Sequence, residues 1–222
     1  MAESCKPSFE GTIPFPYQGE TFETYVRIYG DLENRRNTPV VGLHGGPGLS
    51  HDILVCLSDL ALEYNIPVIL YDQIGNARST HLKEKPGTFW TIDLFIDELE
   101  NLLSHFKISD DFHLLGHSWG GILGVEFEVR RQPKGLNKFI SADSLAAHNL
   151  WLKSVVELAQ TLPEEVRAGL ALGMKDREKY WEALLVLHSH FGCIVKPMPK
   201  QYHDTMAWVF GEHGDPTVAN AS

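Results

Sequence analysis

Cysteine is scarce in this sequence, and long hydrophobic runs are missing from it. The three cysteines in 222 residues, Cys5, Cys56 and Cys193, are odd in number and irregular in spacing. Such a set does not indicate a disulfide framework. The first twenty residues contain no basic stretch followed by an apolar run. We therefore expect no signal peptide, no transmembrane segment and a cytoplasmic location.

Positive charge is also in short supply. Lysine and arginine number 19 against 29 acidic residues, which gives a net charge of −10. The basic residues form no cluster beyond the pairs Arg35-Arg36 and Arg130-Arg131. This balance argues against nucleic acid or an anionic membrane as a partner.

What the sequence does contain is an alternation of short apolar runs with segments of helical periodicity. Strands are expected at 23–30, 39–43, 66–71, 112–117 and 136–143. Between them, helices are expected after Ser50 and over 92–106 and 119–132. This order predicts an α/β fold with a mostly parallel sheet flanked by helices.

The pattern changes after about residue 145. Thr161 and Glu164 have the spacing of a capping box, and Asp176 can cap a helix that ends at Gly192. The segment is a series of helices without buried strands between them. We therefore expect a core over 1–145 and a helical cap over 146–222 that lies above the sheet.

The segment "LLGHSWGGILG" carries the strongest chemical signal. Gly116-His117-Ser118-Trp119-Gly120 is a G-x-S-x-G motif between an apolar strand and a helix. This is the context of a nucleophile elbow, in which a sharp turn exposes a reactive serine. The pattern predicts Ser118 as a nucleophile. The alternative, a small residue in a tight glycine turn, is weaker because the flanking elements fit.

A glycine-rich loop, "HGGPG" at 44–48, follows the expected strand at 39–43. Acyl transfer needs two backbone N–H groups directed at a developing oxyanion. The sequence predicts Trp119 and Gly46 as these donors, with a plain turn as the alternative. We expect His44 and His117 to orient the backbone, not to act as bases. Asp72 and Arg78 are expected to hold the neighbouring loop in place.

Four ordered segments together resemble the proline iminopeptidase family (peptidase family S33) of α/β-hydrolases: "LHGGPGLSHDIL", "ILYDQIGNARST", "LLGHSWGG" and "EKYWEALLVLHSHFGC". The resemblance implies an α/β-hydrolase fold with a helical cap after the sixth strand and no cofactor. It implies a substrate that is a short peptide or amino-acid amide with an N-terminal proline or small apolar residue. It assigns Ser118 as nucleophile, Gly46 and Trp119 as oxyanion donors, and Glu182 as the ligand of the substrate amine. A solvated helix glutamate is the alternative for Glu182.

The partners of Ser118 are harder to find. The family's acid and histidine follow its seventh and eighth strands, and no such strands are evident after residue 145. The histidines after Ser118 are His148, His188, His190, His203 and His213, and the candidate acids are Asp215 and Asp143. We therefore expect a family member that ends within its cap, without its last two strands.

Three readings of function stay open at this point: a serine aminopeptidase or amidase, a catalytically impaired paralogue, or a small-metabolite esterase or amidase. A homo-oligomer is possible in each case. His188, His190, Cys193 and His203 do not have zinc-site spacing, so no metal is expected.

Overall fold

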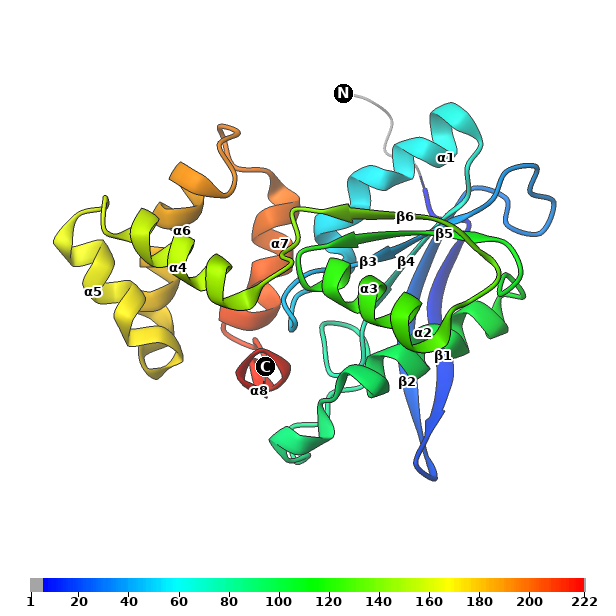
Figure 1. Cartoon of the computed structure of the whole chain (residues 1–222), viewed down its shortest axis with the longest axis horizontal. Helices are drawn as coiled ribbons and strands as arrows, with labels where there is room; N and C mark the ends of the chain where they lie inside the picture. Colours follow the sequence, from blue (N-terminus) through cyan, green and yellow to red (C-terminus); the bar gives the residue numbers. More distant parts are fainter. Residues whose placement is uncertain (1–5, 222) are drawn as a thin grey trace.

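The computed structural model describes residues 6–221 and contains a six-stranded, mostly parallel sheet (Figure 1). The strands are β1 (Phe9–Tyr17), β2 (Glu20–Tyr29), β3 (Val40–Leu43), β4 (Val68–Asp72), β5 (Phe112–His117) and β6 (Leu136–Ala142). Their order in the sheet is β1-β2-β4-β3-β5-β6. β1 and β2 are antiparallel to their neighbours, whereas β4, β3, β5 and β6 run parallel.

The hairpin at the start of the chain was only partly predicted. β2 spans Glu20–Tyr29 instead of 23–30, and β1 was not expected at all. Pro14 and Pro16 interrupt the strand pattern of β1, but β1 lies at the sheet edge, where a missing N–H is tolerated. Gln18 and Gly19 join the strands with φ of 49° and 84°, as a tight hairpin turn requires.

Helices cover both faces of the sheet. α2 (Ile92–His105) and α3 (Trp119–Arg131) lie on one face, and α1 (Ser58–Tyr64) lies on the other (Figure 1). α2 buries Ile96, Leu99 and Leu103, as its periodicity predicts. The Ser50 side chain accepts a hydrogen bond from Asp52 N, but the turns that follow are a 3₁₀ helix, η1 (His51–Leu57), leading into α1.

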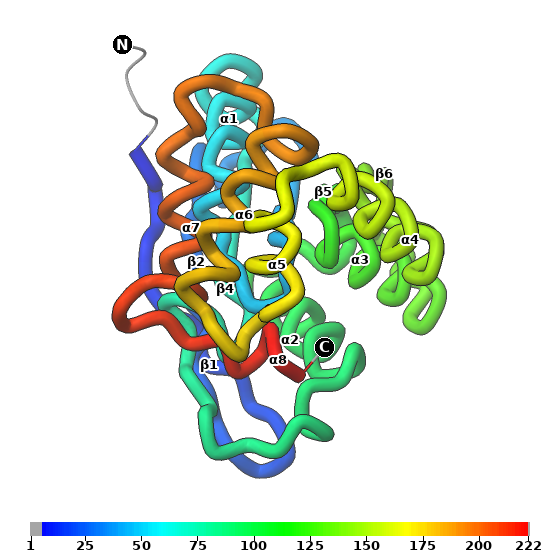
Figure 2. The backbone as a smooth tube through the Cα atoms, turned by 90° about the vertical axis from the view of Figure 1, so that its left-hand side faces the viewer, coloured from blue at the N-terminus to red at the C-terminus, as the bar shows by residue number. Residues whose placement is uncertain are grey.

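The C-terminal third of the chain is helical and lies beside the sheet, at the carboxyl ends of its parallel strands (Figures 1 and 2). It comprises α4 (His148–Ala159), α5 (Glu164–Leu172), α6 (Arg177–Phe191), α7 (Lys200–Phe210) and α8 (Thr217–Ala221), with a 3₁₀ turn, η3 (Gly173–Asp176), before α6. Leu162, Val166, Ala183 and Leu187 form its own small core. We propose the division from the sheet domain near residue 145. In the described residues no helix is both long and apolar enough to cross a membrane.

The two capping predictions for this helical region had different outcomes. Asp176 accepts a hydrogen bond from Lys179 N, and α6 ends at Gly192, as expected. The capping box is wrong, because the Thr161 hydroxyl donates to Leu158 O, 2.7 Å away, and Pro163 precedes the first residue of α5. The hydroxyl closes the end of α4 instead of opening α5.

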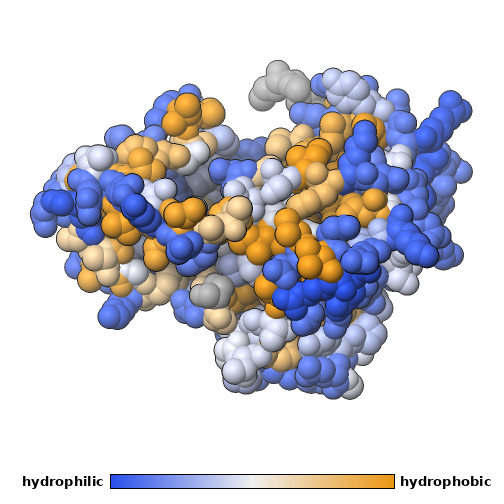
Figure 3. Space-filling model, in the orientation of Figure 1, coloured by the Kyte–Doolittle hydropathy of each residue, from blue (hydrophilic) through white to orange (hydrophobic). Residues whose placement is uncertain are grey.

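One edge of the sheet is open in the described part of the chain. β6 pairs with β5 on one side and has no strand neighbour on the other. Ile140 of β6 is 53% exposed, and Val129 of α3 is 67% exposed. Figure 3 shows hydrophobic surface over these elements. This edge of the sheet is therefore open, with apolar side chains exposed beside it, whereas a homo-oligomer stays a prediction.

A buried carboxyl supports the loop that follows β4. Glu98 of α2 is fully buried and accepts hydrogen bonds from Thr24 Oγ1 at 2.5 Å and from Ile74 N at 2.9 Å. Burial raises the pKa of Glu98 to about 8, because the charged form is poorly solvated there. The folded protein therefore holds this carboxyl protonated at neutral pH.

We predict that Glu98→Gln removes a pH-dependent loss of stability. A carboxyl with a raised folded pKa stabilises the protein below its unfolded pKa, and this contribution is lost as the pH rises through the folded value. Relative to the variant, the free energy of unfolding of the parent should fall by on the order of 1 kcal/mol per pH unit between pH 5 and 8. Denaturant melts at several pH values measure this. A constant difference would contradict the buried, protonated state.

Candidate active site

The site lies where three parallel strands end. β3, β4 and β5 are neighbours in the sheet, and their carboxyl ends deliver the glycine loop, the loop after Asp72, and Ser118. Crevices outside the carboxyl ends of parallel strands are the usual position of ligand sites in open α/β sheets. The predicted residues Ser118, Gly46 and Trp119 are therefore brought together by the fold.

Ser118 occupies a strained turn between β5 and α3. Its φ of 53° and ψ of −116° are unfavourable for a residue with a side chain. The turn is tight because its glycines allow backbone contact. A Cβ on Gly116 would lie 2.2 Å from Gly120 O, and one on Gly120 would lie 2.0 Å from Leu43 O. Only glycine fits at these two positions, so α3 begins directly against the sheet.

The glycine loop lies against this turn. A Cβ on Gly45 would be 3.2 Å from the Ser118 Cβ, so the two segments are in contact. Gly46 has a φ of 121°, which favours glycine. In the described residues the Gly46 N–H donates no hydrogen bond. Trp119 is the first residue of α3, so its N–H has no intrahelical acceptor. The site thus offers two backbone donors beside one hydroxyl.

Buried charges anchor the loop that follows β4. Arg78 Nη1 lies 3.3 Å from Asp72 Oδ2, and the guanidinium contacts both oxygens of Asp52 at 3.0 and 3.1 Å. His51 Nδ1 lies 2.7 Å from Asp72 Oδ1. The expected Asp72–Arg78 contact is confirmed, and Asp52 extends it to η1.

Both carboxyls of this network are ionised at neutral pH. Burial raises the pKa of Asp72, but the hydrogen bond and charge of His51 outweigh it and leave the pKa below its usual value. Burial also raises the pKa of Asp52, but hydrogen bonds from Arg78 and Ser50 outweigh it and lower the pKa to about 2. The charges therefore fix the loop beneath the glycine turn.

No histidine in the described residues is hydrogen-bonded to the Ser118 hydroxyl. Asp215 pairs with His81, whose Nδ1 lies 2.6 Å from Asp215 Oδ2, and His81 Nε2 is occupied by Ala77 O at 2.8 Å. Asp143 Oδ2 is 3.8 Å from His117 Nε2, beyond hydrogen-bond distance. The sequence did not predict the His81–Asp215 pair, because His81 precedes Ser118, whereas the family's acid and histidine follow the serine.

Two histidines of the cap are hydrogen-bonded within the cap. His188 Nδ1 lies 2.5 Å from the Tyr202 hydroxyl, and His190 Nδ1 lies 2.8 Å from Val186 O. In the described part of the chain no group of three or more His, Cys, Asp or Glu side chains is arranged to hold a metal ion. Cys5 lies outside the described residues.

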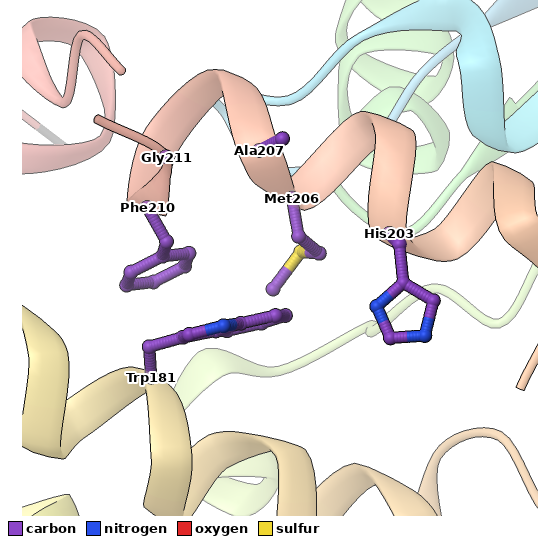
Figure 4. A pocket seen from close by; sticks show the side chains of 6 residues that line it. All are labelled: Trp181, His203, Met206, Ala207, Phe210 and Gly211. Carbon is purple, nitrogen blue, oxygen red and sulfur yellow. The ribbon is translucent and has the colours of Figure 1, made fainter. Parts of the chain in front are cut away.

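Glu182 lies on the exposed side of α6 and has no ion-pair partner among the described residues. Its neighbour Trp181 lines a cavity of about 230 Å³ between α6 and α7 (Figure 4). Trp181 stacks on Phe210 with ring centroids 5.0 Å apart, and Met206 lies beside the indole. Glu182 does not line this cavity, and its role as an amine ligand stays a prediction.

We predict that Ser118→Gly is more stable than Ser118→Ala by about 1 kcal/mol. Glycine relieves backbone strain worth ~1–3 kcal/mol, while its greater freedom in the unfolded chain costs ~0.5–1 kcal/mol. Alanine keeps the strain and removes the same hydroxyl. Denaturant melts of the two variants decide it. If the alanine variant is the more stable, the turn is not strained.

Comparison with known proteins supports the family and the fold. The α/β hydrolase fold family model matches residues 38–177. The chain is 36% identical over 149 residues to the proline iminopeptidase of Lactobacillus delbrueckii subsp. lactis, covering 67% of this chain and 50% of that one. It is 30% identical over 176 residues to the proline iminopeptidase of Lactiplantibacillus plantarum, covering 79% of this chain and 59% of that one. The chain thus spans about half the length of these curated relatives.

Solved structures agree as well. The crystal structure of VinJ matches with a TM-score of 0.85 and 39% identity, over 97% of this chain and 71% of that one. The proline iminopeptidase of Mycobacterium smegmatis matches with a TM-score of 0.77 and 35% identity, over 95% and 70%. The chain therefore belongs to the proline iminopeptidase family of α/β-hydrolases.

Proposed function

We propose that this chain carries the nucleophile and oxyanion hole of a serine hydrolase of the proline iminopeptidase type. The substrate is a short peptide or amino-acid amide with an N-terminal proline or small apolar residue. The observation that carries the proposal is the contact between Ser118 at its strained turn and the glycine loop with its free Gly46 amide. The relatives named proline iminopeptidase support the substrate class.

In the proposed reaction the Ser118 oxygen attacks the carbonyl carbon of the first residue. The carbonyl oxygen gains negative charge and accepts hydrogen bonds from Gly46 N and Trp119 N. The C–N bond then breaks, the rest of the peptide leaves as an amine that has taken the proton of the Ser118 hydroxyl, and the first residue stays as an ester of Ser118. Water attacks this ester, releases the amino acid and restores the hydroxyl. Glu182 is the proposed ligand of the substrate's ammonium group.

We expect slow turnover from these 222 residues alone. A serine hydroxyl is a weak nucleophile unless a base accepts its proton, and no described histidine is bonded to Ser118. A catalytically impaired protein is therefore the second candidate function. We propose a cytoplasmic location for either.

We predict that the purified chain hydrolyses proline 4-nitroanilide at ~10⁻⁵ s⁻¹, because loss of the triad base lowers an ordinary rate of ~10 s⁻¹ by about 10⁶-fold. Added imidazole should raise the rate in proportion to its concentration by acting as the base. Ser118→Ala should abolish the turnover, and Ser104→Ala, an exposed serine of α2, serves as the matched control.

Equal rates for the parent and Ser118→Ala would contradict the proposal. A rate of about 10 s⁻¹ is ordinary for an enzyme. If the chain reached that rate without imidazole, and lost it in Ser118→Ala, a histidine of this chain would be the base. In that case the His81–Asp215 pair is the first to mutate.

A further inference from the structure

Gln73 connects the glycine loop to the residue that follows Ser118. It is fully buried directly after β4. Its Nε2 lies 3.2 Å from His44 O, and its Oε1 lies 3.0 Å from Trp119 Nε1. Its backbone N lies 3.0 Å from His44 Nε2. A single residue thus contacts one segment 29 residues before it and another 46 residues after it in the sequence.

The chemistry of the partners fixes the direction of each bond. An indole N–H can only donate, and a backbone carbonyl can only accept. The amide oxygen of Gln73 must therefore face Trp119, and its NH₂ group must face His44 O. The backbone N–H of Gln73 is a donor, so His44 Nε2 must be an unprotonated acceptor.

The His44 ring is therefore a neutral tautomer with its proton on Nδ1. Burial lowers the pKa of His44 to about 4, which agrees with a neutral ring. Nδ1 lies 2.9 Å from Gly45 O and donates to it. The imidazole thus holds the carbonyl of one particular peptide, the one that joins Gly45 to Gly46.

That peptide carries the proposed loop donor. Its C=O and N–H lie in one plane and point in opposite directions. A bond that fixes the Gly45 carbonyl therefore also fixes the direction of the Gly46 N–H. We propose that His44, held in its tautomer by Gln73, is a positioning residue that directs the Gly46 N–H into the oxyanion hole. This inference rests on the proposed function of Ser118.

Two replacements of His44 separate its two bonds. In His44→Asn the side-chain NH₂ takes the place of Nδ1 and can still donate to Gly45 O. In His44→Gln the side-chain oxygen takes the place of Nε2 and can accept only from Gln73 N. Both remove the ring, and the two replacements differ from each other by one methylene group.

The probe is phenylmethanesulfonyl fluoride, which needs no recognition of proline. The Ser118 oxygen bonds to sulfur, fluoride leaves, and the proton passes to solvent. Intact mass gives the maximal rate and the half-saturating concentration. We expect His44→Gln to lower the maximal rate at least about 10-fold, as loss of an oxyanion donor does. The half-saturating concentration should not change.

The maximal rate of His44→Asn should stay within about threefold of the parent's, because the donor to Gly45 O is kept. Thr38→Val is the control: it loses the bond to Asp111 Oδ1 at the far end of β3, and its rate should also stay within about threefold. Equal rates for His44→Gln and His44→Asn would overturn the inference. So would a parent-like rate for His44→Gln.

A second measurement keeps the inference testable if Ser118 does not react, an outcome that would count against the proposed function alone. The Gly46 amide resonance reports the orientation of that peptide without any chemistry. It should keep its position in His44→Asn and Thr38→Val and move in His44→Gln. An unmoved resonance in His44→Gln overturns the inference.

Discussion

The candidate site depends on the buried hydrogen bonds that join the ends of β3, β4 and β5. Gln73 contacts the loop after β3 through His44 and the start of α3 through Trp119. The loops that leave parallel strands are not bonded to each other by the sheet itself. Without this residue, the two proposed oxyanion donors would be held by separate segments. With it, their relative position is set by bonds that are shielded from water.

Close backbone contact is the second constraint, and glycine alone permits it. Gly116 and Gly120 leave no space for a Cβ, so β5 and α3 meet at the turn that carries Ser118. The strain at Ser118 persists because these contacts determine the turn from both sides. The strained backbone at Ser118 lowers the stability of the fold, and it exposes the hydroxyl that the chemistry needs. Burial of the apolar core beneath the site compensates for this cost.

Local patterns predicted much of this structure because local physics decides it. The buried strands β3 and β5, the amphipathic helix α2 and the turn at Ser118 each have a signal within a few residues. The links between distant segments have no such signal. His81 and Asp215 are 134 residues apart, and the bonds of Gln73 depend on which strand ends are neighbours. β1 was missed because its prolines are acceptable only at an edge, and edges are a property of the sheet.

The most direct test of this account is a crystal structure of the chain after reaction with phenylmethanesulfonyl fluoride. The account predicts a sulfonyl group on Ser118 with one oxygen about 2.7–3.1 Å from both Gly46 N and Trp119 N. The bonds of Gln73 to His44 and Trp119 should be unchanged, since the hole is formed before the reaction. A sulfonyl oxygen that faces solvent, or a glycine loop rearranged around the adduct, would contradict it.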